Sequence, residues 1–439
     1  MLLIYLSKPT ERSKFIFKHI FKVQLGIPYS FTSDQDEFIA HKNEKICYNI
    51  ERFSDNFFIK ASGLLTDDSL KVWDINPGKL NGNHILFSNN TCDLGFDIFS
   101  ASFFLLSRYE EYQPFKEDKS GRFPATESIA YKYGFLNIPI VDHWIQDFGR
   151  ILLNKFPSLT IKRNSFDAIL TYDIDVAYQY KGRSFWRNTG ATIKDILKFD
   201  FGNIKRRLQV IIQNQTDPWD VYDHLLLTSR SSGFGSLFFF LLGNKSAHDR
   251  NLYFKSRVMK SLILKVKQHT QVGIHPSLMS HKNIGLLAME KERLEAIIQE
   301  KVTKSRQHYL KIRFPETYQH LISVGITEDY SMGFPEKPGF RAGTCFPFYF
   351  YDLKNEKITN LKIYPVCVME ATFKYYLKLS PEQTLDEIIG IIDEVKKVGG
   401  TFIPIWHNDN LAKTLSGNCW RDCHDKMIDY LKNNQRTDT

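Results

Sequence analysis

The stretch Thr171-Tyr172-Asp173-Ile174-Asp175 decides how this chain is expected to fold, and it directly follows the apolar run Ala168-Ile169-Leu170. Side chains on a β-strand alternate between two faces, so Thr171, Asp173 and Asp175 share one face. Two carboxylates roughly 7 Å apart at the end of a buried strand are costly unless a cation or a proton offsets their charge. A metal held by one carboxylate, with the other left as a base, meets this condition. A solvated aspartate pair at a cap or turn is the alternative.

Length and composition describe an ordinary globular protein with more than one domain. The chain has 439 residues, with 43% hydrophobic and 24% charged residues, and a single core stops growing at ~250–300 residues. The net charge of +9 is modest and spread along the sequence. It indicates no nucleic-acid groove, and it leaves room for anionic substrates or peripheral contact with a membrane surface.

The cysteines form no disulfide framework. Six are present, and only Cys419-x-x-x-Cys423-His424 has close spacing, without a second ligand pair elsewhere. Free thiols on a C-terminal helix are favoured over a zinc site there. The N-terminus lacks the features of a secretory signal, and no run approaches the ~18 apolar residues of a membrane span. We therefore expect a cytoplasmic protein without a transmembrane segment.

Two units are expected along the chain. Residues 1–160 begin with a strand at residues 1–8 and turn helical at residues 97–106 and 141–153. No group of acids and histidines at strand ends appears in this part. It is therefore predicted to be a smaller α/β domain of unknown role that supplies no catalytic residue, and residues 166–439 are predicted to carry the site.

From Phe166 onward, short apolar strands alternate with helical stretches, which predicts parallel βαβ units. The expected strands are residues 168–174, 237–242, 271–275, 325–330, 363–368 and 401–407. An open sheet and a barrel both satisfy this pattern. The long basic stretch 178–235 is expected to add helices on one side of the sheet, or a lid.

Polar residues follow the ends of these strands, where α/β folds build their sites. They fall at residues 173–175, 275–277, 305–308, 328–331 and 406–409. A single histidine is more often structural. Several histidines and aspartates at strand ends of one domain instead predict a metal site of carboxylates and imidazoles.

The order of these motifs resembles the polysaccharide deacetylase family, carbohydrate esterases with the NodB-homology fold. That family begins with a Thr-Phe-Asp-Asp type strand, which is similar to residues 171–175 with one residue inserted. An aromatic-rich strand, a Gly-x-His-Ser/Thr stretch, an Arg loop and a strand ending in His follow. Their counterparts here are residues 236–243, 273–277, 305–308 and 405–408.

The resemblance covers about residues 166–415 and is closest to a Bacteroidetes-type branch with a separate N-terminal domain. It implies an α/β fold, a distorted (β/α) barrel preceded by a smaller α/β domain. The family's second metal-binding His lies four residues after the first, where this chain has Met279, and His281 is six residues on. His308 in the Arg loop is therefore the expected third ligand.

On this resemblance, a divalent metal, expected to be Zn²⁺, is held by Asp175, His275 and His308. Three protein ligands leave open positions for water and an acetamide oxygen. The metal would polarise the carbonyl and stabilise the developing oxyanion.

The remaining polar residues receive catalytic roles. Asp173 would take a proton from the attacking water, and His407 would protonate the leaving amine. Arg306 would orient Asp173 through a bidentate ion pair, unless it is a surface residue at a helix start.

Three further residues are expected to bind substrate. Asp329 and Trp406 would shape the pocket, with Trp406 offering an apolar face to a sugar ring. Arg341 lies between two glycines in Gly339-Phe340-Arg341-Ala342-Gly343-Thr344. That segment is interpreted as a substrate-facing loop or as a plain turn, and it is not a phosphate-binding fingerprint.

The function expected from these features is metal-dependent hydrolysis of an N-acetyl group on a sugar. Cell-surface polysaccharide or lipopolysaccharide biosynthesis is the setting, with an N-acetylated glycan precursor as substrate. One alternative is an inactive carbohydrate-binding protein on the same barrel, which is supported by Met279 at the position of the family's second metal-binding His. The other is an amide hydrolase acting on a non-sugar substrate.

Overall fold

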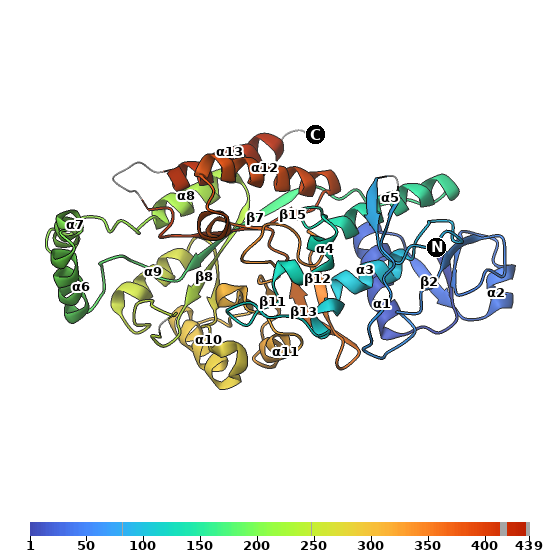
Figure 1. Ribbon diagram of the computed structural model, residues 1–439, viewed down its shortest axis with the longest axis horizontal. Coiled ribbons are helices and arrows are strands. Elements are labelled where there is room, and N and C mark those ends of the chain that lie inside the picture. The colour runs from blue at the N-terminus through green and yellow to red at the C-terminus, as the bar shows by residue number, and fades with distance from the viewer. Residues whose placement is uncertain (81, 247, 413–418, 436–439) are drawn as a thin grey trace.

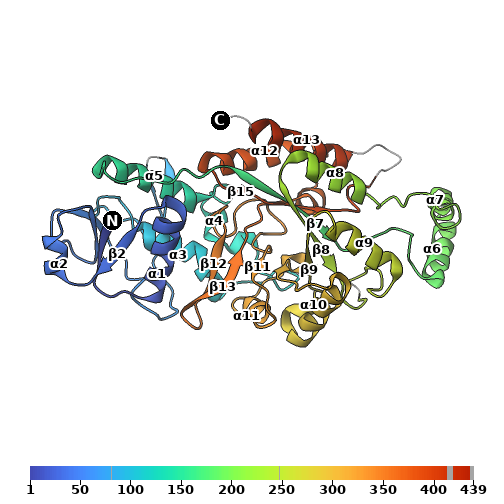
Figure 2. The same ribbon diagram turned by 180° about the vertical axis from the view of Figure 1, so that it is seen from behind.

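The computed structural model describes residues 1–80, 82–246, 248–412 and 419–435. Figure 1 shows an elongated molecule with a small sheet at the N-terminal end and a large sheet in the middle. A pair of helices, α6 (Phe185–Leu197) and α7 (Phe201–Ile211), projects at the opposite end. Figure 2 gives the same order from behind. No helix in the described ranges is both long and apolar enough to cross a bilayer.

The N-terminal part is built on a four-stranded parallel sheet of order β2-β1-β3-β4. Its strands are β1 (Leu2–Leu6), β2 (Tyr29–Thr32), β3 (Lys45–Asn49) and β4 (Phe57–Lys60). The helices are α1 (Glu11–Phe17), α2 (Gln35–Ala40), α3 (Ile98–Leu106), α4 (Ile129–Lys132) and α5 (Ile140–Lys155), with a small hairpin of β5 (Gly78–Leu80) and β6 (Asn83–Ile85). Every residue of α3 is buried, including Ser100 and Ser102 among its apolar side chains. The predicted first strand and both predicted helices are confirmed.

The large sheet has the order β12-β13-β11-β10-β9-β8-β7-β16-β14, and β15 also pairs with β7. Its strands are β7 (Asp167–Ile174), β8 (Gly235–Leu241), β9 (Gln271–His275), β10 (Lys304–Ser305), β11 (Glu328–Asp329), β12 (Phe348–Asp352), β13 (Lys357–Ile363), β14 (Val368–Met369), β15 (Thr401–Phe402) and β16 (Pro404–His407). All pairings are parallel except that of β12 with β13. The predicted strand 363–368 is wrong in part, because the chain leaves β13 at Ile363 and enters β14 only at Val368.

The segment between β13 and β14 closes the large sheet into a distorted barrel. Tyr364 N donates to Asp329 O at 2.8 Å beside β11, and Cys367 N donates to Ile403 O at 3.3 Å beside β16. The chain therefore crosses from one flank of the sheet to the other without forming a ladder. Side chains from both flanks and from the middle meet in a small interior core of Leu237, Phe239, Leu310, Tyr330, Val366, Ile403 and Ile405. The predicted α/β class with a barrel of this kind is confirmed.

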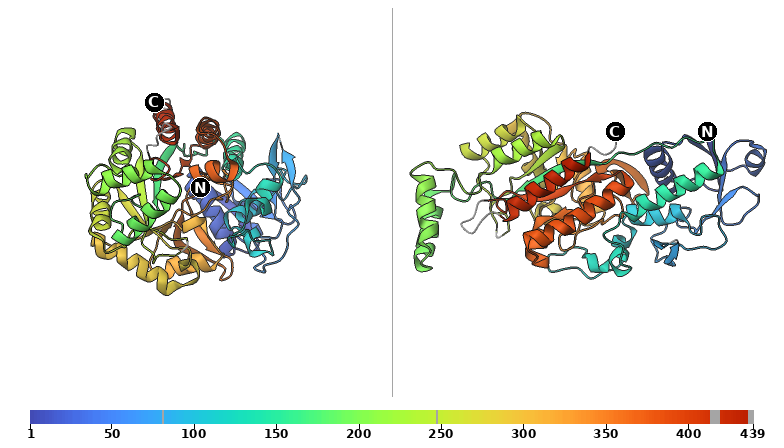
Figure 3. Two further views of the ribbon diagram at one scale, coloured as in Figure 1. Left: turned by 60° about the vertical axis from the view of Figure 1, so that its left-hand side comes forward. Right: turned by 90° about the horizontal axis from the view of Figure 1, so that it is seen from above.

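Helices cover the outside of the barrel. They are α8 (Tyr222–Ser232), α9 (Arg257–Lys267), α10 (Ile284–Ile298), α11 (Glu316–Ser323), α12 (Pro381–Val398) and α13 (Cys419–Gln435). Figure 3, seen from above, shows α12 and α13 side by side. Along β7, Leu170, Tyr172 and Ile174 belong to the core shared with these helices. Asp173 therefore faces the barrel interior, as the alternation predicts.

Buried polar contacts join the N-terminal part to the barrel. Arg341 Nε donates to Glu111 Oε1 at 2.9 Å, and Arg108 Nε donates to the same oxygen at 2.8 Å. Arg12 Nε donates to Glu356 Oε2 at 2.9 Å, and Asp142 accepts from Cys345 N at 2.8 Å. The hydrophobic core is continuous across this junction.

Candidate metal centre

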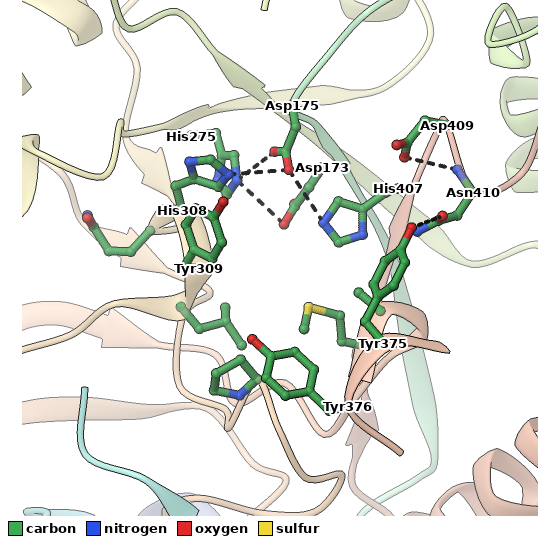
Figure 4. Close-up of a pocket in the computed structure, with 15 residues that line it drawn as sticks. Asp173, Asp175, His275, His308, Tyr309, Tyr375, Tyr376, His407, Asp409 and Asn410 are labelled. Carbon is green, nitrogen blue, oxygen red and sulfur yellow. Dashed lines mark hydrogen bonds and ion pairs between the residues drawn. The ribbon is translucent and has the colours of Figure 1, made fainter. Parts of the chain in front are cut away.

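The carboxyl end of β7 places two acids at the mouth of the barrel. Asp173 pairs in register with Phe239 of β8 and His407 of β16, so it lies between these strands. It is 3% exposed. Asp175 follows directly after β7 and is partly exposed. Both acids line a cavity of about 370 Å³, shown in Figure 4.

Two histidines approach Asp175 from neighbouring strand ends. His275 ends β9, and its Nε2 lies 3.1 Å from Asp175 Oδ1. His308 follows β10, and its Nε2 lies 3.3 Å from Asp175 Oδ2. Ligand atoms of these three residues all lie within 4.8 Å of one another. The structure therefore brings together the three side chains predicted to hold a metal.

The other nitrogen of each imidazole is already engaged. His275 Nδ1 lies 2.6 Å from Arg306 O, an acceptor, so this nitrogen carries the proton. His308 Nδ1 lies 2.9 Å from Asp249 Oδ1. In the neutral imidazoles, both Nε2 lone pairs then point at the carboxylate of Asp175.

This arrangement needs a positive charge between the three groups. Asp175 Oδ1 is buried and accepts no hydrogen bond, although it lies beside His275 Nε2. Burial lowers the pKa of His308, but the carboxylates of Asp175 and Asp249 outweigh it and raise the pKa to about 9. When no metal cation is bound, a proton on His308 supplies the positive charge. Two imidazole nitrogens and a carboxylate oxygen are also a donor set that Zn²⁺ accepts, so the residues fit a metal.

Arg306 anchors Asp173 beside this group, with Asp173 Oδ2 3.9 Å from His275 Nε2. Arg306 Nη1 donates to Asp173 Oδ1 at 2.8 Å, while its Nε donates to Tyr330 O at 2.9 Å. The guanidinium lies over the ring of Phe239, 4.5 Å from its centroid, and is fully buried. The expected bidentate pair is therefore corrected: Arg306 gives Asp173 one bond and the backbone another. Asp173 Oδ2 stays free of Arg306.

His407 lies across the cavity from the two histidines and is held by a residue that the sequence reasoning missed. Its Nδ1 lies 2.7 Å from Glu370 Oε1, and its Nε2 lies 3.8 Å from Asp175 Oδ2. Burial acts to lower the pKa of His407, but the carboxylate of Glu370 and then that of Asp175 raise it well above the ordinary value. The imidazole is therefore held as a cation.

Both missed carboxylates act on a histidine of the site. Glu370 comes one residue after β14, so a carboxylate at the end of a short apolar run was its only signal in the sequence. Asp249 lies in the loop between β8 and α9, away from any strand end, and had no such signal.

The three predicted substrate contacts do not line the cavity, and those predictions are corrected. Trp406 neighbours His407 on β16, so alternation turns it outward, where its ring packs edge-on against His424. Asp329 is fully buried and accepts from Ser305 Oγ and Ser331 Oγ, each at 2.8 Å. Arg341 is occupied at the junction with the N-terminal part.

Tyrosines take the place of the expected tryptophan. Tyr309, Tyr375 and Tyr376 line the cavity with 39%, 57% and 44% of their surface exposed. Figure 4 places Tyr309 beside His308, Tyr375 near His407 and Tyr376 on the side opposite the acids. Asp409 and Asn410 lie beside His407. Aromatic faces at an open rim suit the apolar side of a sugar ring.

The position of the family's second histidine is not part of the site. Met279 is 59% exposed. His281 turns its Nδ1 to Leu278 O at 2.6 Å and does not line the cavity.

A second group of imidazoles lies outside the barrel, on α8 and α13. His224 Nε2 and His424 Nδ1 each lie 2.9 Å from Asp425 Oδ1, and His424 Nε2 lies 3.2 Å from the hydroxyl of Tyr172. This network joins the helices to β7. The neighbouring Cys423 is a buried free thiol, whereas the side chain of Cys419 lies outside the described residues.

Comparisons with known proteins give a family model that matches the first part of the chain, and solved structures that are similar at low identity. A model for DUF7033, a family of unknown function, matches residues 2–157. No curated protein matches the chain.

Solved structures resemble a little over three fifths of the chain at low identity. A candidate polysaccharide deacetylase from Mycobacterium smegmatis is 13% identical, with a TM-score of 0.40, over 63% of this chain and 86% of that one. The polysaccharide deacetylase Bc1974 from Bacillus cereus is 9% identical, with a TM-score of 0.31, over 62% and 89%. A CE4 family pseudoenzyme from Bacillus anthracis is 11% identical, with a TM-score of 0.31, over 62% of each chain.

Proposed function

We propose that this chain is a metal-dependent hydrolase that removes an N-acetyl group from a sugar during the assembly of a cell-surface polysaccharide or lipopolysaccharide. The observation that carries the proposal is the convergence of His275 and His308 on Asp175, with both Nε2 atoms directed at one carboxylate. A second acid and a cationic imidazole stand within the same cavity.

A Zn²⁺ ion bound to Asp175, His275 and His308 would supply Lewis acidity toward the acetamide carbonyl and toward water. The chain's own groups move the protons. Asp173 Oδ2, free of Arg306, takes a proton from the attacking water. Arg306 fixes the orientation of that carboxylate.

His407 delivers a proton to the departing amine. Its Nδ1 is held by Glu370, so Nε2 carries the proton that faces the cavity. Asp173 and His407 come from adjacent strands, β7 and β16, which fixes their separation through the backbone ladder. The acid and the base are therefore independent groups, and each proton transfer has its own residue.

The cavity suits one sugar residue and its acetamide. Its volume of about 370 Å³ lies at the lower end of ligand sites, and it opens between tyrosine rings. We propose that these rings stack on the sugar while Asp409 and Asn410 meet its hydroxyl groups.

The proposal assigns the chemistry to residues 166–439 and none of it to residues 1–160. Among the residues that the structure describes, those that line the cavity fall between Asp173 and Asn410, which supports this division. We further propose that the protein works in the cytoplasm on an N-acetylated glycan precursor.

The experiment is to assay the purified chain for bound metal and for acetate release from N-acetylated sugars, both free and nucleotide-linked. We expect one metal per chain and acetate release that stops on chelation and returns with Zn²⁺. Acetate release from non-sugar acetamides alone would mean that the substrate is an amide other than an N-acetylated sugar. Bound metal and bound sugar without acetate release would instead establish a carbohydrate-binding protein.

A further inference from the structure

The two helices inserted between β7 and β8 stand apart from the catalytic barrel. Figures 1 and 3 show α6 and α7 projecting at the end of the molecule opposite the N-terminal sheet. No described side chain of this pair lines the cavity, so the pair does not form a lid over it. Their base is tied down by Asp217, which accepts from the backbone amides of Gln179, Tyr180 and Lys181 at 2.8–2.9 Å.

Both helices carry an exposed apolar stripe with the same spacing. On α6 the stripe consists of Trp186, Ile193, Ile196 and Leu197, which are 50–81% exposed. The α7 stripe repeats the offsets with Phe201, Leu208 and Ile211, which are 44–64% exposed, and Ile212 just beyond the helix, which is 70% exposed. At 3.6 residues per turn, these offsets keep each stripe within ~120° of the helix circumference.

The two stripes lie on the same side of the pair. Arg207 of α7 donates to Thr192 Oγ1 at 2.7 Å and to Asp195 Oδ2 at 2.6 Å on α6, which defines the contact face. Each of these residues stands one position before a stripe residue of its own helix. Since a short turn at residues 198–200 makes the helices antiparallel, the same ~100° rotation carries both stripes to one side.

The pair is also basic. From residue 184 to residue 212 the chain has six Lys and Arg residues and two Asp residues. One of the aspartates, Asp195, is already paired with Arg207. Lys194, Lys198 and Lys205 are exposed. Their long side chains can extend beside the stripe and place their charges at the level of lipid phosphates.

We propose that the α6–α7 pair is an interfacial anchor that seats its apolar side among the headgroups of an anionic phospholipid bilayer. A flat, projecting, apolar and basic surface is the form that such anchors take. A second copy of the chain is the less suitable occupant, because it would bring two positively charged surfaces together. The anchor is independent of the proposed deacetylation.

The test is co-sedimentation of the full chain with vesicles of phosphatidylcholine, alone or mixed with phosphatidylglycerol. We expect binding to the mixed vesicles that weakens with added salt. Leu197→Ser/Phe201→Ser/Ile212→Ser should reduce binding about tenfold or more, because three large apolar side chains no longer enter the interface.

Two further variants separate the contributions. Lys194→Glu/Lys198→Glu/Lys205→Glu should abolish the preference for phosphatidylglycerol. The matched control Ile50→Ser/Val72→Ser removes exposed apolar side chains of the N-terminal part, which are 61% and 81% exposed, and should bind as the native chain does. Thermal unfolding and acetate release from a soluble substrate check that each variant is folded.

Two results would overturn the anchor. One is the absence of binding to both kinds of vesicle by the folded native chain. The other is a native chain that self-associates in sedimentation equilibrium, with the triple Ser variant monomeric, because the apolar side would then be an interface between copies.

Discussion

Glu370 fixes both the backbone and the side chain of His407. Its Oε1 accepts from His407 N at 3.0 Å and lies 2.7 Å from His407 Nδ1. The same oxygen accepts from Asn410 Nδ2 at 2.8 Å. One buried carboxylate therefore sets the orientation and the charge of the residue that we assign as general acid.

Glu370→Gln should lower kcat by about 10–100-fold, the cost usually seen when the partner that orients a functional histidine is lost. Bound metal should not change, since Glu370 touches none of the three ligands. Steady-state kinetics and metal analysis on one preparation measure both. The control is Glu394→Gln, which removes a carboxylate from the outlying His143. Unchanged kcat in Glu370→Gln would contradict the assignment of His407 as the general acid.

Asp173→Asn should abolish acetate release while bound metal stays, whereas Asp175→Asn should lose both. A carboxylate that coordinates an ion is a poor base, because the ion depresses its pKa. Losing the positioned base costs ~10²–10⁴-fold in rate. Acetate release and metal content on both variants are the measurements. Equal metal loss in the two variants would mean that both carboxylates share the ion.

Asp249→Asn should weaken metal binding by about 10–100-fold, because Asp249 orients His308 through Nδ1. Competition with a chelator of known affinity measures the change. Asp223→Asn is the matched control, since its side chain is 83% exposed on α8. Equal affinity in the two variants would mean that His308 needs no partner or is no ligand.

Arg341→Met should destabilise the protein by about 3 kcal/mol and leave KM unchanged. The substitution leaves Glu111 buried with Arg108 as its remaining partner, and breaking a buried pair costs ~3–5 kcal/mol. Urea unfolding and steady-state kinetics provide the two readouts. A raised KM at full stability would restore the substrate-binding role that the structure withdraws from Arg341.

The buried His19 should make the protein sensitive to acid. Burial lowers the pKa of His19 to about 4, and its Nε2 has no hydrogen-bond partner. Between the unfolded value of 6.5 and this folded value, the unfolded chain binds more protons, so stability falls as pH falls. The loss should be about 1.4 kcal/mol per pH unit. His19→Leu should remove this part of the slope in urea titrations between these pH values, and identical slopes would contradict it.

The sequence predicted the features that depend on strand alternation. Asp173 faces inward and Asp175, His275 and His308 converge because parallel strands end at one edge of the sheet. The same rule places Trp406 outward once His407 faces inward, so the wrong prediction for Trp406 could have been avoided. The wrong prediction for Arg341 could not, because no local pattern indicates its partner Glu111, which lies 230 positions earlier in the chain.

Glu370 and Asp249 could not be predicted from the sequence for a related reason. Each orients a histidine that lies far from it in the sequence, 37 positions away for Glu370 and 59 for Asp249. Residue types and local spacing do not indicate such pairings. The two carboxylates became visible only when the fold had brought their partners beside them.

The hydrophobic core runs continuously from the N-terminal part into the barrel, so the two parts of the chain share one core. Arg341, Cys345 and Glu356 of the barrel are each satisfied by residues made more than two hundred positions earlier. During synthesis, Glu111 and Asp142 are made long before their partners Arg341 and Cys345. We therefore expect a fragment that starts at residue 166 to be less stable than the whole chain, because Arg341, Cys345 and Glu356 would lose these partners.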